Sequence, residues 1–339
     1  MHLIVHIGPH KTGTSSIQAA LRSNEELLAQ FGVAVFSVGA GQIRELSLPY
    51  SRVREITHPS VMNVFGTPEN ALRNSEDRWR YFEKSVRDNR YPTSIISSEH
   101  FSSLAKPAIF FSRLRAMFEL ITVVCYARDP ISLYTSSLQE QILNRGFGEH
   151  TATIYDYRVR YQKFLEYSSA AVGAENIIIR NFARDNLVNG DVVADFFSIV
   201  GRFVKLPYIS KVLERESIPG AALAWLVRED EIRGSPMPFQ QRQRFSRLLR
   251  RDIDFCKLPK LAFKDPDWSR VVRHNNRCTY EWLDSTFLND QIPILNETWM
   301  SKPLNSRPSN ILSEMRRWIM EYLDLDAENL ITNAISVSR

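Results

Sequence analysis

The chain has 339 residues, which is long enough to bury a full hydrophobic core and to form one large domain or two modest ones. Its hydrophobic content of 44% and charged content of 24% are ordinary for a soluble globular protein. The formal net charge of +5 suits anionic ligands, but it is too small and too evenly spread to indicate a nucleic-acid partner.

Cysteine usage and the start of the chain bear on location. Cys125, Cys256 and Cys278 are widely spaced and odd in number, so they predict neither a disulfide framework nor a zinc site. The chain contains no run of 18 apolar residues, and the first expected strand begins at residue 2 or 3, which leaves no room for a removable signal. We therefore expect a cytoplasmic protein with no membrane span.

Buried strands are predicted first. Five short runs are nearly continuous in apolar and β-branched residues, a pattern typical of strands covered on both faces in a parallel sheet. They are LIVHI (3–7), VAVFSV (33–38), TSIISS (93–98), ITVVCYA (121–127), which makes Cys125 a core residue, and NIIIRNF (176–182).

Helical patterns lie between these runs. The first follows residue 13 and is expected to stop at Gly32. SEDRWRYFEKSVRDN predicts a helix from Ser75, and DPISLYTSSLQEQILNR predicts one with Asp129 as N-cap and Pro130 at the first helical position. Alternating strands and helices favour a three-layer α/β fold with a parallel central sheet.

Three further segments complete the organisation. Residues 39–70 show no clean period and several turn signals, as expected of a substrate-facing loop or lid. From about residue 205 the chain is mostly helical. We divide it into a core, 1–205, and a helical part, 206–339, that belongs to the same domain or caps it. Within that part the basic tract RQRFSRLLRRDIDF (242–255) predicts a solvated helix face with Phe245, Leu248 and Leu249 turned inward.

The turn after the first strand, GPHKTGTSS, indicates an anion site. A strand, a glycine-containing turn and a helix N-terminus together direct backbone N–H groups and a favourable helix dipole at one point. A Walker A loop, G-x-x-x-x-G-K-[ST], has its lysine after the second glycine, whereas here Lys11 stands two residues before Gly13. The candidate anion-binding residues are Gly8, His10, Lys11, Thr12, Gly13, Thr14, Ser15 and Ser16.

A second candidate anion site follows the fourth strand, in YARDPISLYTSS. Arg128 leaves that strand at the carboxyl edge of the sheet, where open α/β folds bind ligands. Ser136 follows eight residues later, about two turns into the next helix. Both side chains are placed to reach one anion displaced from the first.

The spacing of His2, His6 and His10 by four residues does not indicate a metal site. The first two fall on one face of a strand and the third lies in the loop, so we expect core and loop roles and no metal.

HIGPHKTGTSS followed by YARDPISLYTSS resembles the sulfotransferases that use 3′-phosphoadenosine 5′-phosphosulfate. That family has a 5′-phosphosulfate loop, P-K-[ST]-G-T-[TS], and a later R-[DN]-P-x-x-x-x-x-S motif for the 3′-phosphate; here His10 replaces the proline. Residues 175–201 also resemble the family's later strand, turn and helix. The resemblance implies a P-loop NTPase-like topology. Arg128 and Ser136 then hold the 3′-phosphate, and no clear counterpart of the family's C-terminal R-K-G stretch is present.

The same resemblance implies where the proton acceptor lies. Lys11 steadies the leaving 5′-phosphate, and the base is expected at the end of the third strand, at Glu99 or His100. Carbohydrate sulfotransferases place a glutamate there and the small-molecule branch a histidine, so Glu99 is favoured and a carbohydrate is the leading acceptor, with other small hydroxyl or amine compounds open.

The hypothesis is thus a bacterial sulfotransferase that needs no metal; its oligomeric state is left open. Two alternatives remain. A nucleotide kinase or hydrolase needs a strand-end carboxylate for magnesium, and the nearest candidate, Asp129, is expected to serve as a helix cap. A non-catalytic nucleotide-binding protein keeps the donor pocket without turnover.

Overall fold

The computed structural model describes residues 1–36, 42–89, 91–207, 209, 218–249, 253–288 and 307–336. By its internal contacts the chain divides into two compact units. The first comprises Met1–Arg128, Arg160–Glu214 and Thr279–Ile292, and the second comprises Asp129–Val159, Arg215–Cys278 and Pro293–Arg339. The units alternate along the chain, and the division into 1–205 and 206–339 stays a prediction.

The first unit is built on a five-stranded parallel sheet with the order β2-β3-β1-β4-β5. Its strands are β1 (His2–His6), β2 (Val33–Val35), β3 (Thr93–Ser97), β4 (Leu120–Ala127) and β5 (Ile177–Asn181). Ile4 of β1 is in register with Ile95 of β3 and with Thr122 of β4. The strands form where apolar and β-branched residues run on without alternation, because both faces are covered.

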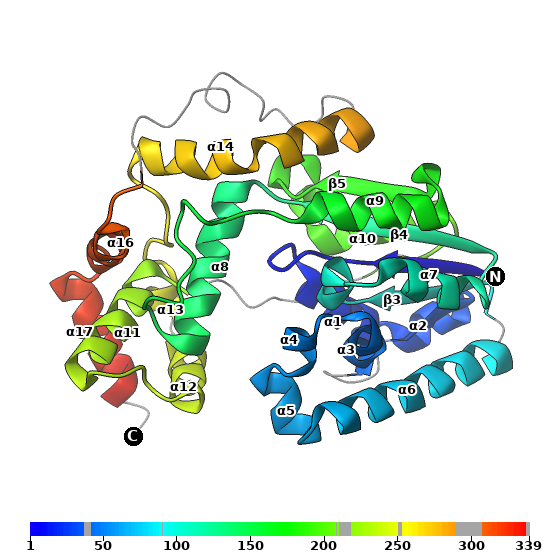
Figure 1. The fold of residues 1–339 in the computed structure, drawn as a ribbon, viewed down its shortest axis with the longest axis horizontal. Coiled ribbons are helices and arrows are strands. Elements are labelled where there is room, and N and C mark those ends of the chain that lie inside the picture. The colour runs from blue at the N-terminus through cyan, green and yellow to red at the C-terminus, as the bar shows by residue number, and fades with distance from the viewer. Residues whose placement is uncertain are drawn as a thin grey trace. The chain divides into compact units, whose positions relative to one another are not determined.

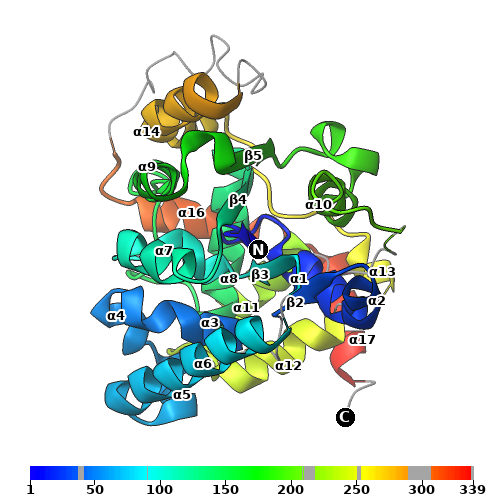
Figure 2. The ribbon, with the colours of Figure 1, turned by 90° about the vertical axis from the view of Figure 1, so that its right-hand side faces the viewer.

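Helices cover both faces of this sheet, which confirms the predicted three-layer α/β class (Figure 2). On one face lie α1 (Thr14–Ser23), α2 (Glu25–Gln30) and α10 (Val192–Val200), which share a buried cluster with the sheet. On the other lie α7 (Pro107–Arg115) and α9 (Tyr161–Val172). The loop 8–13 joins the central strand to α1, the strand–loop–helix order of P-loop-like topology.

The remaining helices of the first unit lie mainly between β2 and β3. They are α3 (Gln42–Ser47), η2 (Leu48–Tyr50), α4 (Val53–Ile56), α5 (Pro59–Phe65) and α6 (Pro68–Asn89), with η3 (Glu99–Ser103) after β3, and η4 (Ala174–Asn176), η5 (Arg184–Asn186), η6 (Val188–Gly190) and η7 (Asp284–Leu288) later in the chain. The described part of the expected irregular segment, 42–70, is therefore mostly helical; residues 39–41 lie outside the described residues.

Two helix boundaries differ from the prediction. α6 begins at Pro68 and not at Ser75, because Ser75 is no cap: its buried hydroxyl donates to the backbone oxygen of Glu45 at 2.5 Å. The first helix is divided at Asn24, whose side-chain amide donates to the backbone oxygen of Ala20. Gly32, with φ 75°, follows the end of α2 as predicted.

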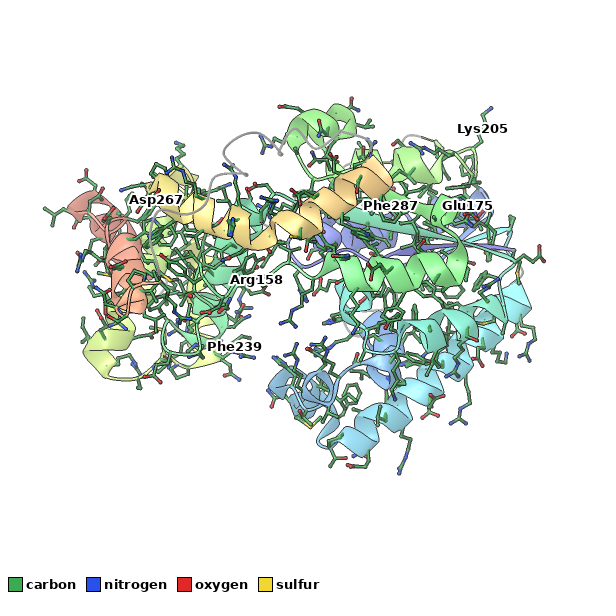
Figure 3. All side chains as sticks on the ribbon, turned by 45° about the horizontal axis from the view of Figure 1, so that its top comes forward. Arg158, Glu175, Lys205, Phe239, Asp267 and Phe287 are labelled. Carbon is green, nitrogen blue, oxygen red and sulfur yellow. The ribbon has the colours of Figure 1, made fainter. Side chains whose placement is uncertain are left out.

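The second unit is helical in its described residues (Figure 1). It contains α8 (Pro130–Arg145), α11 (Gly220–Arg233), α12 (Phe239–Leu249), α13 (Ile253–Cys256), α16 (Ile311–Met320) and α17 (Leu325–Ser336); α14 (Pro266–Leu283) runs through the division at residue 278. Figure 3 marks Phe239 and Asp267 in the first turns of α12 and α14, and Phe287 in η7. No helix in the described part of the chain is long and apolar enough to cross a bilayer.

The basic tract is only partly a solvated face. Phe245 and Leu249 are buried as predicted, and Leu248 is half-buried. Arg242, however, is fully buried and forms an ion pair with Asp230 of α11. Its guanidinium also donates to the backbone oxygens of Met237 and Ile142, at 2.9 and 2.7 Å. This arginine is therefore a core residue, which a count of charges along the tract does not indicate.

Candidate functional site

Four strand ends meet at the carboxyl edge of the sheet in the first unit. β1 ends at His6, β3 at Ser97, β4 at Ala127 and β5 at Asn181. Because all of them are parallel, the segments that follow them emerge at one edge. The sheet thereby brings together the glycine loop, the Glu99–His100 pair, Arg128 and the turn at Phe182.

The glycine loop contains two residues in the left-handed region. Lys11 has φ 68° and Gly13 has φ 77°. Glycine adopts this conformation without penalty, but for lysine it costs about 1–2 kcal/mol, so the rest of the loop holds Lys11 in a strained state. Left-handed residues are a component of backbone nests, in which successive N–H groups point into one concavity, so these two residues are compatible with the predicted anion site.

Both loop glycines are required by close packing. A Cβ on Gly8 would lie 2.1 Å from Thr14 Oγ1, and a Cβ on Gly13 would lie 2.7 Å from Val192 Cγ1 at the start of α10. Because these two residues have no Cβ, the loop can pack closely against Thr14 in α1 and against Val192 in α10.

The loop hydroxyls are not equivalent. Thr12 is buried and its hydroxyl donates to the backbone oxygen of Pro9 at 2.7 Å, so this proton is used in a hydrogen bond within the loop. Ser15 is exposed. Thr14 Oγ1 and Ser16 Oγ are buried and have no hydrogen-bond partner among the described residues. Buried hydroxyls without protein partners are rare in native proteins, so these two are available to hydrogen-bond a ligand or a water molecule. Thr14 and Ser16 are thus the best hydroxyl candidates for an oxyanion.

Arg128 lies against the loop. Its guanidinium Nη1 donates to the backbone oxygen of Lys11 at 2.6 Å, and its Cζ lies 5.5 Å from the centre of the Phe182 ring. The hydroxyl of Tyr280 donates to the backbone oxygen of Arg128. The arginine that was predicted to hold a second, distant anion therefore contacts the first loop directly.

Glu99 and His100 begin the short helix η3 directly after β3, as predicted. The carboxylate Oε1 of Glu99 lies 3.8 Å from Nδ1 of His10, whose side chain is half exposed. The His10 and His100 rings meet edge to face with centroids 5.9 Å apart. Burial, and next the positive charge of Arg44, lower the pKa of His100 to about 3, so this imidazole is neutral at pH 7.

Three further predicted residues are described by their own surroundings. Ser136 is half-buried in α8, which belongs to the second unit. Asp129 caps α8, as predicted, by accepting a hydrogen bond from the Ser132 N–H at 2.9 Å. Cys125 is buried in β4, also as predicted. Among the described residues, no three His, Cys, Asp or Glu side chains are grouped closely enough to hold a metal ion.

Sequence reasoning missed three contributors to this edge. Arg44 comes from α3, in a segment expected to be irregular, and its charge acts on His100. Val192 and Phe182 pack around Gly13 after β5. The helix Gln42–Ser47 spans fewer than two turns, so its sequence shows no recognisable helical period. The packing of a loop on a helix far along the chain also leaves no local sequence pattern.

Comparison with known proteins adds one structural likeness. No family model and no curated protein matches the sequence. Among solved structures, the chain is similar to a sulfotransferase from Alicyclobacillus acidocaldarius, with a TM-score of 0.39 and 13% identity, over 71% of this chain and 98% of that one. A TM-score below 0.5 establishes neither a shared fold nor a shared activity, so the site has to be interpreted from its own residues.

Proposed function

We propose that the chain is a sulfotransferase that moves a sulfuryl group from 3′-phosphoadenosine 5′-phosphosulfate to a hydroxyl or amine acceptor. The observation that carries the proposal is the glycine loop: a strained Lys11, a left-handed Gly13 and two buried hydroxyls without described partners, on Thr14 and Ser16. Together with the order of the two sequence motifs, this loop supports an oxyanion such as the 5′-phosphosulfate.

Arg128 supports the assignment of the 3′-phosphate of the donor. Its guanidinium donates a hydrogen bond to the backbone oxygen of Lys11, so a cationic group lies beside the loop. In this proposal Arg128 both shapes the loop and faces the 3′-phosphate side of the donor.

The chemistry follows from the charges. The acceptor oxygen forms the new bond to sulfur while the bond from sulfur to the bridging 5′-phosphate oxygen breaks. Lys11 stabilises the negative charge that develops on that leaving oxygen. The acceptor's proton goes to Glu99. His100 is a weaker base than an ordinary histidine, because burial lowers its pKa to about 3.

A carbohydrate is the acceptor class that we propose, in the cytoplasm of a bacterium. The support is the glutamate at the end of β3 and the mixed polar surroundings of Glu99, with His10 at 3.8 Å and Arg44 on α3 close enough to act on His100. Hydroxyl-rich ligands suit such mixed donors and acceptors.

Calorimetry with 3′-phosphoadenosine 5′-phosphate tests the donor site. We expect micromolar binding that Lys11→Ala weakens by about 1–3 kcal/mol, as for the loss of a charge-assisted hydrogen bond. Lys163→Ala, which removes an exposed lysine on α9, is the matched control and leaves binding unchanged. Tight binding of ATP with magnesium, and none of the 3′-phosphorylated nucleotide, would instead favour a kinase or hydrolase.

A turnover assay separates an enzyme from a binding protein. Sulfur-labelled donor is incubated with panels of glycans, phenols and amines, and label transfer is measured. Glu99→Gln is expected to lower the rate about 100-fold or more while the nucleotide still binds, and His100→Gln to lower it less. A chain that binds the nucleotide but transfers label to none of the acceptors, in any variant, is a binding protein.

A further inference from the structure

Two buried polar atoms lie under the glycine loop without partners. Nε2 of His6 and Oγ1 of Thr14 are both buried, and neither has a hydrogen bond to any described residue. They approach the same point: the position of a Cβ on Gly8 would be 2.1 Å from Thr14 Oγ1 and 3.0 Å from His6 Nε2. The missing side chain of Gly8 therefore leaves these two atoms facing one small space.

The His6 ring is held in one orientation. Its Nδ1 forms a 2.8 Å hydrogen bond with Oγ of Ser97 in β3. The rings of Tyr126 and Phe196 pack on it, with centroids 5.9 and 5.5 Å away. With Nδ1 fixed on Ser97, the Cε1–Nε2 edge of the ring faces Gly8, and these two atoms lie 2.9 and 3.0 Å from its Cβ position.

The protonation state of this ring decides what it offers. Complete burial lowers the pKa of His6 to about 3, so the imidazole is neutral at pH 7 and carries one proton. With that proton on Nδ1, Nε2 accepts the Thr14 hydroxyl proton and removes it from the loop. With the proton on Nε2, the ring donates to Thr14 Oγ1, and the Thr14 proton points to a bound oxyanion.

We propose that His6 is a positioning residue for the anion loop, in which Ser97 donates to Nδ1, Nε2–H donates to Thr14 Oγ1, and Thr14 donates to the bound oxyanion. The hydrogen bond from His6 to Thr14 closes when the anion enters. The inference rests on the proposed function only in that the loop binds an oxyanion; it does not require that the anion be a sulfuryl donor.

Inorganic sulfate is the probe, because its binding needs the loop and not the rest of a nucleotide. The tautomer of His6 is measured by ¹⁵N NMR of histidine-labelled protein, and its signals are assigned by their loss in His6→Gln. We expect the Nε2–H form, with a change in the Nε2 shift on sulfate titration. An Nδ1–H form in the sulfate-bound protein would overturn the proposal.

A pair of matched variants tests the role of Nε2. In His6→Gln the side-chain amide reaches the Nε2 position, whereas in His6→Asn it reaches only the Nδ1 position. We expect sulfate affinity within about twofold of the wild type for His6→Gln and about fivefold weaker for His6→Asn, the loss typical of one neutral hydrogen bond. Equal affinities in these two variants, each shown to be folded by circular dichroism, would overturn the proposal.

A double-variant cycle shows whether His6 acts through Thr14. Because Thr14→Val already removes the hydroxyl, adding His6→Asn is expected to weaken sulfate binding no further. If the losses of sulfate affinity from Thr14→Val and His6→Asn multiply in the double variant, His6 does not act through Thr14. This outcome would contradict the proposed hydrogen-bond relay from His6 through Thr14 to the anion. Ser97→Ala is expected to weaken sulfate binding in the same direction as His6→Asn, and Ser94→Ala, at another buried serine of β3, leaves it unchanged.

The two proposals fail differently. If sulfate binds with the predicted dependence on His6 but 3′-phosphoadenosine 5′-phosphate does not bind, the donor assignment is wrong and the relay stands. If the wild type binds neither anion, both are wrong.

Discussion

The guanidinium of Arg128 donates a 2.6 Å hydrogen bond to the backbone carbonyl oxygen of Lys11. A residue at the end of β4 thus fixes the backbone of the residue that carries the strain in the loop after β1. The contact is charge-assisted, and the Phe182 ring covers the guanidinium. The shape of the loop therefore depends on a neighbouring strand as well as on its own glycines.

Arg128→Ala is accordingly expected to weaken binding of both 3′-phosphoadenosine 5′-phosphate and adenosine 5′-phosphate, by about 1–3 kcal/mol. Both nucleotides lose affinity because the loop carbonyl is released, and the 3′-phosphorylated nucleotide is expected to lose more, because Arg128 also faces its 3′-phosphate in the proposed donor site. Isothermal calorimetry measures the two affinities, and Arg184→Ala, at an exposed arginine in η5, is the control for net charge. A loss confined to the 3′-phosphorylated nucleotide would show that Arg128 acts on the ligand and not on the loop.

Lys11 combines a charge that we propose acts on the donor with an unfavourable backbone conformation, and two variants separate these properties. Lys11→Gly and Lys11→Ala both remove the ammonium, so both are expected to lose nucleotide binding to the same extent. Only glycine relieves the strain at φ 68°, so Lys11→Gly is expected to be about 1 kcal/mol more stable than Lys11→Ala. Urea denaturation measures the difference. Equal stabilities would mean that the loop relaxes when the side chain is removed.

Much of the sheet was predictable from the sequence, for a physical reason. A strand covered on both faces needs a continuous apolar run, and all five such runs form strands. The cap at Asp129 was predictable because it depends on residues within one turn. In both cases the deciding interactions are local or follow from composition alone.

The features that were missed depend on partners far apart in the chain. In the sequence Arg242 cannot be told apart from the exposed arginines of its tract. Only the fold shows that it is buried and paired with Asp230. The sequence predicts a helix start at Ser75, but in the fold this residue lies inside α6 and its hydroxyl donates to the Glu45 carbonyl. His6 was expected to be a satisfied core residue, and only the fold shows that one of its nitrogens lies unpartnered beneath the loop. The roles of the loop and of the Glu99–His100 pair stay predictions, and only the fold shows how these residues lie relative to one another.

Gly13 is expected to respond to substitution differently from a left-handed glycine in open space. Gly66 has φ 75° with no atom within 4 Å of its Cβ position, so Gly66→Ala is expected to cost about 1–2 kcal/mol of stability. Gly13→Ala adds a clash with Val192 and is expected to cost more and to abolish nucleotide binding. Val192→Ala in the same chain is expected to recover part of that stability. Thermal unfolding and calorimetry test the series, and the absence of recovery would exclude the clash as the cause.

Acid stability reports on the buried His6. Its folded pKa of about 3 lies below the unfolded value near 6.5, so between these pH values the unfolded chain binds a proton that the folded protein does not. Stability is therefore retained above pH 6.5 and falls as the pH drops toward 3, by about 1.4 kcal/mol per pH unit for this one group. His6→Gln is expected to show a shallower loss than the wild type between pH 7 and pH 5 in urea denaturation. Parallel curves would show that His6 does not remain neutral in the folded protein.

The ion pair between Arg242 and Asp230 gives the corresponding test for the second unit. Arg242 is fully buried, and its partner Asp230 also accepts a 2.8 Å hydrogen bond from the Met237 N–H. Removing one member leaves the other as an uncompensated buried charge, so Arg242→Ala is expected to lower stability by about 3–5 kcal/mol.

Arg244→Ala, two residues along the same helix at an exposed position, is expected to change stability by less than about 0.5 kcal/mol. The double variant Arg242→Met/Asp230→Leu replaces the pair by apolar groups and is expected to recover much of the loss, because no charge is then left unpaired. Guanidinium denaturation measures all three. If Arg242→Ala and Arg244→Ala cost the same, then Arg242 behaves as a solvated residue and the tract is the uniform basic face that its sequence suggests.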